Sequence, residues 1–277
     1  MPNAGPPADA LTGGEPATVA IPVLVEEYGG RLYQIARRFC TTPEEAEDLV
    51  QETFLQAFRH WDSFEGRARP TTWLYTIAAR LCQRFHRKRS GEPDHLLSWD
   101  ESQPFHAPAL GVVPPEGDPL AEQVRREARD RLEAAILALP EDFRMPFILR
   151  EVAGLSVEEI ARVMELKPAT VKTRLHRARL RLRDAVEGAL PKRELPPPAL
   201  PRQVALDLLQ ARQEALDRGE PFRFPEDRFC ERCQEFFATL ELPGDLCREL
   251  ASGDLPSEVR ERLLTRLAAE GSTGKGA

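Results

Sequence analysis

The side chains with the clearest chemical use lie in an arginine-rich stretch, residues 166–183. As a helix, this stretch would fit the major groove of DNA, where its cationic groups can meet phosphates and base edges. A short amphipathic run, residues 156–164, precedes it. The pair is typical of a helix-turn-helix, so the sequence predicts a nucleic-acid-binding element here.

Position along this second helix separates two kinds of contact. Pro168 suits its first turn, and the residues just after it lie at the end that reaches base edges in this motif. The later arginines would hold backbone phosphate and fix the register, and we expect His176 to meet phosphate or solvent, with no role in pH sensing. The expected base-edge residues are Ala169, Thr170, Lys172, Thr173 and Arg174, and the expected phosphate contacts are Arg177, Arg179, Arg181 and Arg183.

A second group with chemical potential is formed by three cysteines near the C-terminus. Cys230-x-x-Cys233 has a common chelating spacing, and Cys247 follows 14 residues later. Glu226 is the first choice for a fourth ligand, and Asp227, Asp245 and Glu249 are alternatives. Three thiolates suit a thiophilic metal, namely zinc, copper or cadmium. Metal or redox sensing, a metal-free docking domain and an unrelated role all stay open.

The remaining cysteines, Cys40 and Cys82, each stand alone on an apolar helical face. We expect both to be small buried hydrophobic residues. Five cysteines in such a chain do not indicate a disulfide framework.

The elements that position these residues are helical, and strand signals are almost absent. Apolar residues recur every three or four positions in three regions, and proline-rich stretches separate them. We predict an all-α protein: two small helical DNA-binding domains on a flexible linker, plus a small helical C-terminal domain. The expected parts are a disordered tail (1–20), a first domain (21–89), a linker (90–119), a helix-turn-helix domain (120–190), a proline-rich linker (191–201) and a C-terminal regulatory domain (202–277).

Charge is distributed unevenly in this chain of 277 residues with a net charge of −7. Positive charge gathers at residues 80–89 and 174–183, whereas acid gathers at 44–52, 92–118 and in the C-terminal third. The acidic parts repel phosphate, so the chain alone would bind DNA poorly and would bind well once a partner positions those parts.

Membrane and secretion signals are missing from the sequence. No apolar run approaches the roughly 20 residues that span a bilayer. The first 20 residues lack the basic start and apolar centre of a signal peptide. We therefore expect a cytoplasmic protein without a membrane partner.

Three motifs in a fixed order resemble bacterial sigma factors of the extracytoplasmic-function (ECF) group. Residues 48–58 resemble the helix that binds core RNA polymerase, and residues 64–80 resemble the segment that melts and reads the −10 promoter element. Residues 139–144 together with 156–179 resemble the domain that reads the −35 element. The resemblance covers about residues 20–190.

The resemblance implies a transcription initiation factor with no catalysis of its own and no required cofactor. Its partners would be core RNA polymerase (the β′ and β subunits) and promoter DNA, and an anti-sigma factor is a further candidate. The implied site residues are Asp48, Gln51, Glu52, Phe54 and Gln56 for the polymerase; Trp73, Arg80, Arg84, Arg87 and Lys88 for the −10 element; and Ala169, Thr170, Lys172, Thr173, Arg174 and Arg177 for the −35 element.

Two other functions compete with this interpretation. A stand-alone helix-turn-helix regulator would use the same residues 156–183 but would not need the motifs at 48–58 and 64–80. A Cys-x-x-Cys redox enzyme would need a strand-helix-strand pattern around Cys230, which the sequence lacks.

We expect the C-terminal domain to pack on the DNA-binding domains and to regulate activity by favouring one state over another.

Overall fold

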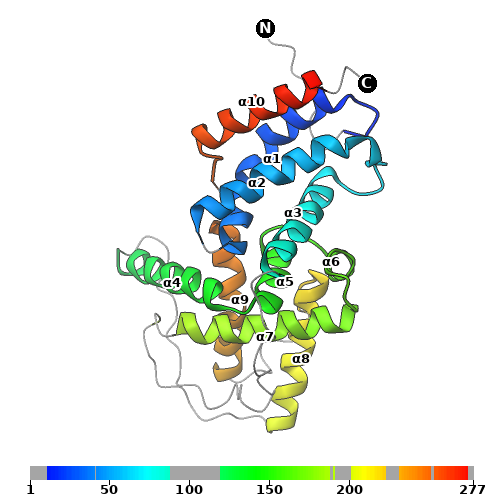
Figure 1. Ribbon diagram of the computed structural model, residues 1–277. Helices are drawn as coiled ribbons and strands as arrows, with labels where there is room; N and C mark the ends of the chain where they lie inside the picture. Colours follow the sequence, from blue (N-terminus) through cyan, green and yellow to red (C-terminus); the bar gives the residue numbers. More distant parts are fainter. Residues whose placement is uncertain are drawn as a thin grey trace. The chain divides into compact units, whose positions relative to one another are not determined.

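The computed structural model describes residues 11–40, 42–87, 119–187, 190, 201–222, 231–250 and 253–273. In these residues all regular structure is helical, which agrees with the expected all-α class. The chain forms two compact units (Figure 1). Unit 1 comprises Met1–Ser90, Val152–Leu155 and Glu249–Ala277, and unit 2 comprises Gly91–Glu151 and Ser156–Arg248.

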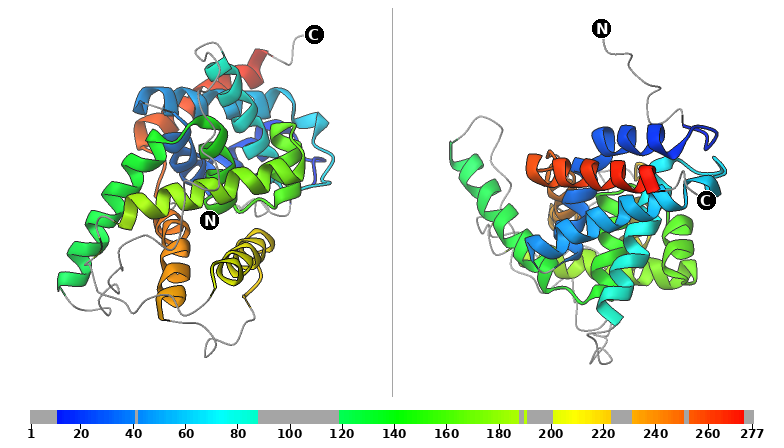
Figure 2. Two further views of the ribbon diagram at one scale, coloured as in Figure 1. Left: turned by 90° about the horizontal axis from the view of Figure 1, so that it is seen from below. Right: turned by 45° about the horizontal axis from the view of Figure 1, so that its top comes forward.

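The described residues of unit 1 form four α-helices and one short 3-10 helix. These are α1 (Ala17–Phe39), α2 (Pro43–Arg59), η2 (Trp61–Ser63), α3 (Pro70–Arg87) and α10 (Ser257–Thr273). The largest buried side chains of its core include Leu32, Phe54, Trp61 and Tyr75. Both views of Figure 2 show α10 lying along α1 and α2, far from them in sequence but adjacent in space.

The start of α2 follows directly from its sequence. The Thr42 side chain accepts a hydrogen bond from the backbone N–H of Glu45 at 3.2 Å, and Pro43 occupies the first helical turn. Glu44 and Glu45 place negative charge near the positive end of the helix dipole. Thr42 is therefore the N-cap of α2.

The part of unit 2 that the structure describes forms six helices: α4 (Pro119–Ala138), α5 (Glu141–Glu151), α6 (Val157–Met164), α7 (Pro168–Glu187), α8 (Arg202–Arg218) and α9 (Glu231–Leu250). Ser156 and Glu159 form a capping box at the start of α6. Glu165 ends that helix with φ 56°, a left-handed conformation. Three residues then separate α6 from α7, so the predicted helix-turn-helix is present.

The structure differs from the expected domain organisation at both ends of the chain. Helix α1 begins at Ala17, Leu11 is buried, and the carbonyl of Glu15 accepts a 2.7 Å hydrogen bond from the Trp61 indole. Residues 11–20 are thus part of unit 1 and not of a disordered tail. The expected C-terminal domain is shared between the units, because α8 and α9 belong to unit 2 and α10 to unit 1.

None of the helices in the described part of the chain combines the length and the apolar character that crossing a bilayer requires.

Candidate DNA-binding and docking surfaces

The N-terminal end of α7 carries the residues expected to read base edges. Ala169 and Thr173 are exposed, while Thr170, Lys172 and Arg174 are partly exposed. The Thr173 hydroxyl donates to the Ala169 carbonyl at 3.0 Å, and the Arg174 guanidinium lies 2.9 Å from the Asp142 carboxylate. This end of the helix therefore presents hydroxyl, ammonium and guanidinium groups together, and Arg177, one turn further on, is partly exposed as well.

One face of the next turns of α7 is buried, contrary to the expectation that Arg179 and Arg183 hold phosphate. Their exposed fractions are 2% and 4%, and that of His176 is 7%. The three residues lie three and four positions apart, so one face of the helix carries them all. That face is covered by α8 and α9, which sequence periodicity alone did not place there.

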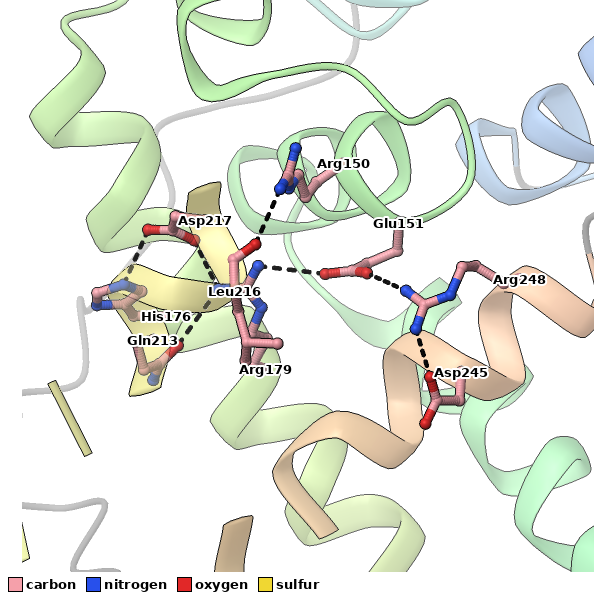
Figure 3. Close-up of polar contacts among 9 residues, drawn as sticks. All are labelled: Arg150, Glu151, His176, Arg179, Gln213, Leu216, Asp217, Asp245 and Arg248. Atoms are coloured by element: carbon pink, nitrogen blue, oxygen red, sulfur yellow. Dashed lines mark hydrogen bonds and ion pairs between the residues drawn. The ribbon is translucent and has the colours of Figure 1, made fainter. Parts of the chain in front are cut away.

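Asp217 of α8 is the anion that receives two of these groups (Figure 3). Its carboxylate lies 2.7 Å from Nη1 of Arg179 and 3.1 Å from Nε2 of His176, and its side chain has no exposed surface. Burial alone would raise the pKa of Asp217, but the hydrogen bond from His176 and the charge of Arg179 outweigh it, so its pKa is lowered. His176 is thus a buried partner of a carboxylate and not a phosphate contact.

The polar network continues beyond Asp217. Nη2 of Arg179 lies 3.2 Å from the Glu151 carboxylate, which in turn lies 2.8 Å from the Arg248 guanidinium of α9 (Figure 3). Arg150 donates to the carbonyl of Leu216 at 2.8 Å. These contacts join α5, α7, α8 and α9 within unit 2, so α8 and α9 are integral to the unit that holds the helix-turn-helix.

Arg183 is held by an aromatic face as well as by polar groups. Its guanidinium carbon lies 4.3 Å from the centre of the Phe236 ring, and its Nε donates to Thr239 at 3.2 Å. Burial is the main cause of the lowered pKa of Arg183. Around it an apolar cluster joins α7, α8 and α9, formed by Leu180, Leu208, Leu209, Phe236, Phe237 and Leu240.

In unit 1, the expected polymerase-binding residues divide between two faces of α2. Asp48 is exposed, and Glu52 and Gln56 are partly exposed and joined by a 2.7 Å hydrogen bond. Gln51 is only 8% exposed and accepts a 3.0 Å hydrogen bond from Arg266 of α10. Phe54 has no exposed surface, so its side chain stabilises the core and is not available to a partner.

The first turns of α3 carry Trp73, expected to contact DNA. It is partly exposed, and its ring centre lies 5.7 Å from that of Trp61 and 5.3 Å from that of Phe64. Further along the same helix, Arg80 and Arg84 are exposed one turn apart. Arg87 ends α3 with a side chain outside the described residues, and Lys88 lies outside them entirely.

Two of the expected metal ligands lie far apart on one helix. Cys233 and Cys247 both belong to α9, and their spacing of 14 positions corresponds to about 21 Å along a helix. Zinc–sulfur bonds of about 2.3 Å cannot bridge that separation. Cys247 is fully buried, while Glu226 and Cys230 lie outside the described residues. Within the described residues no cluster of three or more metal-ligating side chains occurs.

Cys40 and Cys82 are both buried, at 5% and 1% exposure, as expected for small apolar residues.

A helix-turn-helix with an exposed basic end, joined in one chain to a helical unit with exposed arginines, defines a DNA-binding transcription factor. Comparisons with known proteins define the class further. Residues 24–92 match sigma-70 region 2, and residues 129–182 match sigma-70 region 4.

Several curated relatives are similar in sequence as well. The chain is 32% identical to the ECF RNA polymerase sigma factor SigW of Bacillus subtilis, over 58% of this chain and 85% of the relative. It is 33% identical to the RNA polymerase sigma-H factor of Pseudomonas aeruginosa, over 62% of this chain and 86% of the relative. The ECF sigma-E factor of Escherichia coli is 33% identical over 58% of this chain and 83% of the relative. The chain belongs to the ECF sigma factors, and because the match includes region 2, a stand-alone helix-turn-helix regulator is not supported.

Proposed function

We propose that the chain docks on core RNA polymerase through α2 and directs it to promoters through α3 and α7. The polymerase surface would be the polar and acidic stripe of Asp48, Glu52 and Gln56, with Gln51 at its edge. In this role the chain supplies recognition and no catalysis of its own, and it acts in the cytoplasm, where the polymerase works. An anti-sigma factor is a further candidate partner.

The proposal rests on the presence of two exposed surfaces of opposite charge, one on α2 and one on α7. On α2, Asp48 and Glu52 present carboxylates that suit a basic polymerase surface. On α7, Lys172, Thr173 and Arg174 present donors at the end of a helix that this motif directs into the major groove. An operator-binding protein would need only the second surface.

Exposed side chains on α3 support a role at the −10 element. Arg80 and Arg84 suit phosphate contact, and the partly exposed Trp73 offers a ring face on which an unpaired base can stack. Because the Trp73 ring already packs near Trp61 and Phe64, its position is fixed before DNA arrives. Such preorganisation lowers the entropic cost of binding.

A binding titration with core polymerase tests the docking surface. The double variant Asp48→Ala/Glu52→Ala should weaken binding by about tenfold or more, because it removes both carboxylates from the stripe. Glu44→Ala is the matched control, since this exposed carboxylate lies on the same helix but at its first turn. Equal affinities for the wild type, the double variant and the control would reject the proposed surface.

A further inference from the structure

Helix α10 covers a face of α1 and α2 with a regular apolar stripe. Val259, Leu263 and Leu267 recur every four residues and are 1%, 0% and 3% exposed. Leu255, just before the helix, is also buried. The stripe faces α1 and α2, since α10 contacts both helices (Figure 1).

Arginines beside this stripe meet acceptors on the covered helices. Arg260 donates to Glu26 of α1 at 2.9 Å, Arg262 pairs with Glu47 of α2, and Arg266 donates to Gln51 at 3.0 Å. At the far end, Glu270 of α10 lies 2.5 Å from Arg59 of α2. Exposed pairs of this kind contribute little to stability, but they fix the register and direction of a docked helix.

Two adjacent glycines in α1 are matched to the chain that leads into α10. A Cβ atom on Gly30 would lie 2.3 Å from the carbonyl oxygen of Gly253, and one on Gly29 would lie 3.1 Å from Cδ2 of Leu255. Glycine is unfavourable inside a helix relative to alanine. The close approach of residues 253–255 explains why α1 has no side chains at these positions.

We propose that α10 occupies the edge of the polymerase-docking surface of α2, at Gln51, and competes with core polymerase for that surface. This inference rests on the proposed function, which places the polymerase on α2. Gln51, at the edge of the proposed docking stripe, is already bonded to Arg266, and the Arg59–Glu270 pair lies close along the same helix. The arginines of α10 offer α2 the basic chemistry that a polymerase helix would offer.

The competition sets the apparent affinity for polymerase. If only the form with α10 displaced binds, the apparent dissociation constant equals the intrinsic one divided by the population of that form. Weakening the α10 contacts therefore tightens polymerase binding, whereas weakening the docking stripe itself loosens it. The sign of the change distinguishes a competitor from a helix that only completes the core.

Polymerase-binding measurements on full-length chains with substitutions in α10 or α1 test the direction of this change in affinity. Arg266→Glu and Gly30→Ala should each lower the apparent dissociation constant for core polymerase by about fivefold or more. Thr265→Glu/Ala268→Glu matches the charge change of Arg266→Glu at exposed positions of α10 and should leave affinity unchanged. Gly29→Ala should have a smaller effect than Gly30→Ala, because its Cβ meets the movable end of a side chain and not a backbone carbonyl.

Hydrogen exchange on the wild type provides a second measurement that needs no variant. Adding core polymerase should deprotect the amides of residues 257–273 while those of α1–α3 stay protected. Unchanged protection of α10, together with equal affinities of wild type and variants, would overturn the inference but leave the proposed function intact. Failure of the wild type and of every variant to bind core polymerase would instead overturn the proposed function.

Discussion

Arg179 of α7 donates to Asp217 of α8 across 2.7 Å, and their side chains are 3% and 0% exposed. An arginine of the recognition helix α7 thus faces inward and binds a carboxylate of α8. The same carboxylate binds His176, so one anion satisfies two basic groups on α7. The match to sigma-70 region 4 ends at residue 182. The helices α8 and α9, which follow it, therefore pack against the recognition helix as part of the same unit.

Removing the buried anion should destabilise unit 2. Asp217→Asn leaves Arg179 without its closest counter-charge, and breaking one partner of a buried pair costs about 3–5 kcal/mol. Asp245→Asn is the control, since this carboxylate pairs with Arg248 in solvent and should cost no more than about 1 kcal/mol. Denaturant unfolding of the full chain measures both, and equal losses would contradict the buried-pair account.

Stability should also fall in acid, with Asp217 as one cause. Its pKa is below the ordinary value of 3.8, since the hydrogen bond from His176 and the charge of Arg179 outweigh the effect of burial. A depressed carboxyl pKa stabilises the fold at pH values above 3.8, and this contribution is lost as pH falls through the lower folded value. The groups that contact the carboxylate are His176 and Arg179, and Arg179 also donates to the side-chain oxygen of Gln213. Between pH 5 and pH 2, the urea midpoint of Asp217→Asn should fall less steeply than that of the wild type. If the two midpoints fall in parallel, Asp217 is not a cause of the loss of stability in acid.

Two cationic residues of α7 should respond differently to salt. Lys172→Ala removes a partly exposed charge near the reading end, so promoter affinity should fall and the slope of log K against log salt should decrease by about 1. Arg179→Met removes a buried charge, so it should lower stability without changing that slope, measured at a temperature where the variant is folded. Equal slope changes would show that Arg179 reaches phosphate.

Phe54 and Asp48 lie on the same helix but should affect different properties. Phe54→Ala creates a cavity in the core of unit 1 and should cost about 3–5 kcal/mol of unfolding free energy. Asp48→Ala, at an exposed position, should change stability by less than about 0.5 kcal/mol. Thermal or denaturant unfolding separates them, and a small effect of Phe54→Ala would contradict its place in the core.

The helices and their exposed ends could be predicted from the sequence because their signals are local. Thr42 and Pro43 mark the start of α2, and Pro168 marks that of α7. The period of three to four residues gave the helical class without any knowledge of tertiary contacts. The exposure of the reading end of α7 followed from the helix-turn-helix pattern alone.

The partners of buried charges could not be predicted, since they are distant in sequence. Asp217 lies 38 residues from Arg179, and Glu270 lies 211 residues from Arg59. Arg179 and Arg183 share a helical face with His176, which was the available sign that all three point inward. The Gly29-Gly30 pair was a second such sign, because adjacent glycines inside an amphipathic helix indicate that another backbone approaches closely.

Run-off transcription from promoter DNA with purified core RNA polymerase tests the central claim most directly. We expect promoter-dependent transcripts when the full chain is added to core enzyme, fewer with Asp48→Ala/Glu52→Ala, and more with Gly30→Ala. Transcript levels that do not change on adding the chain, for a template from its own regulated promoters, would contradict it.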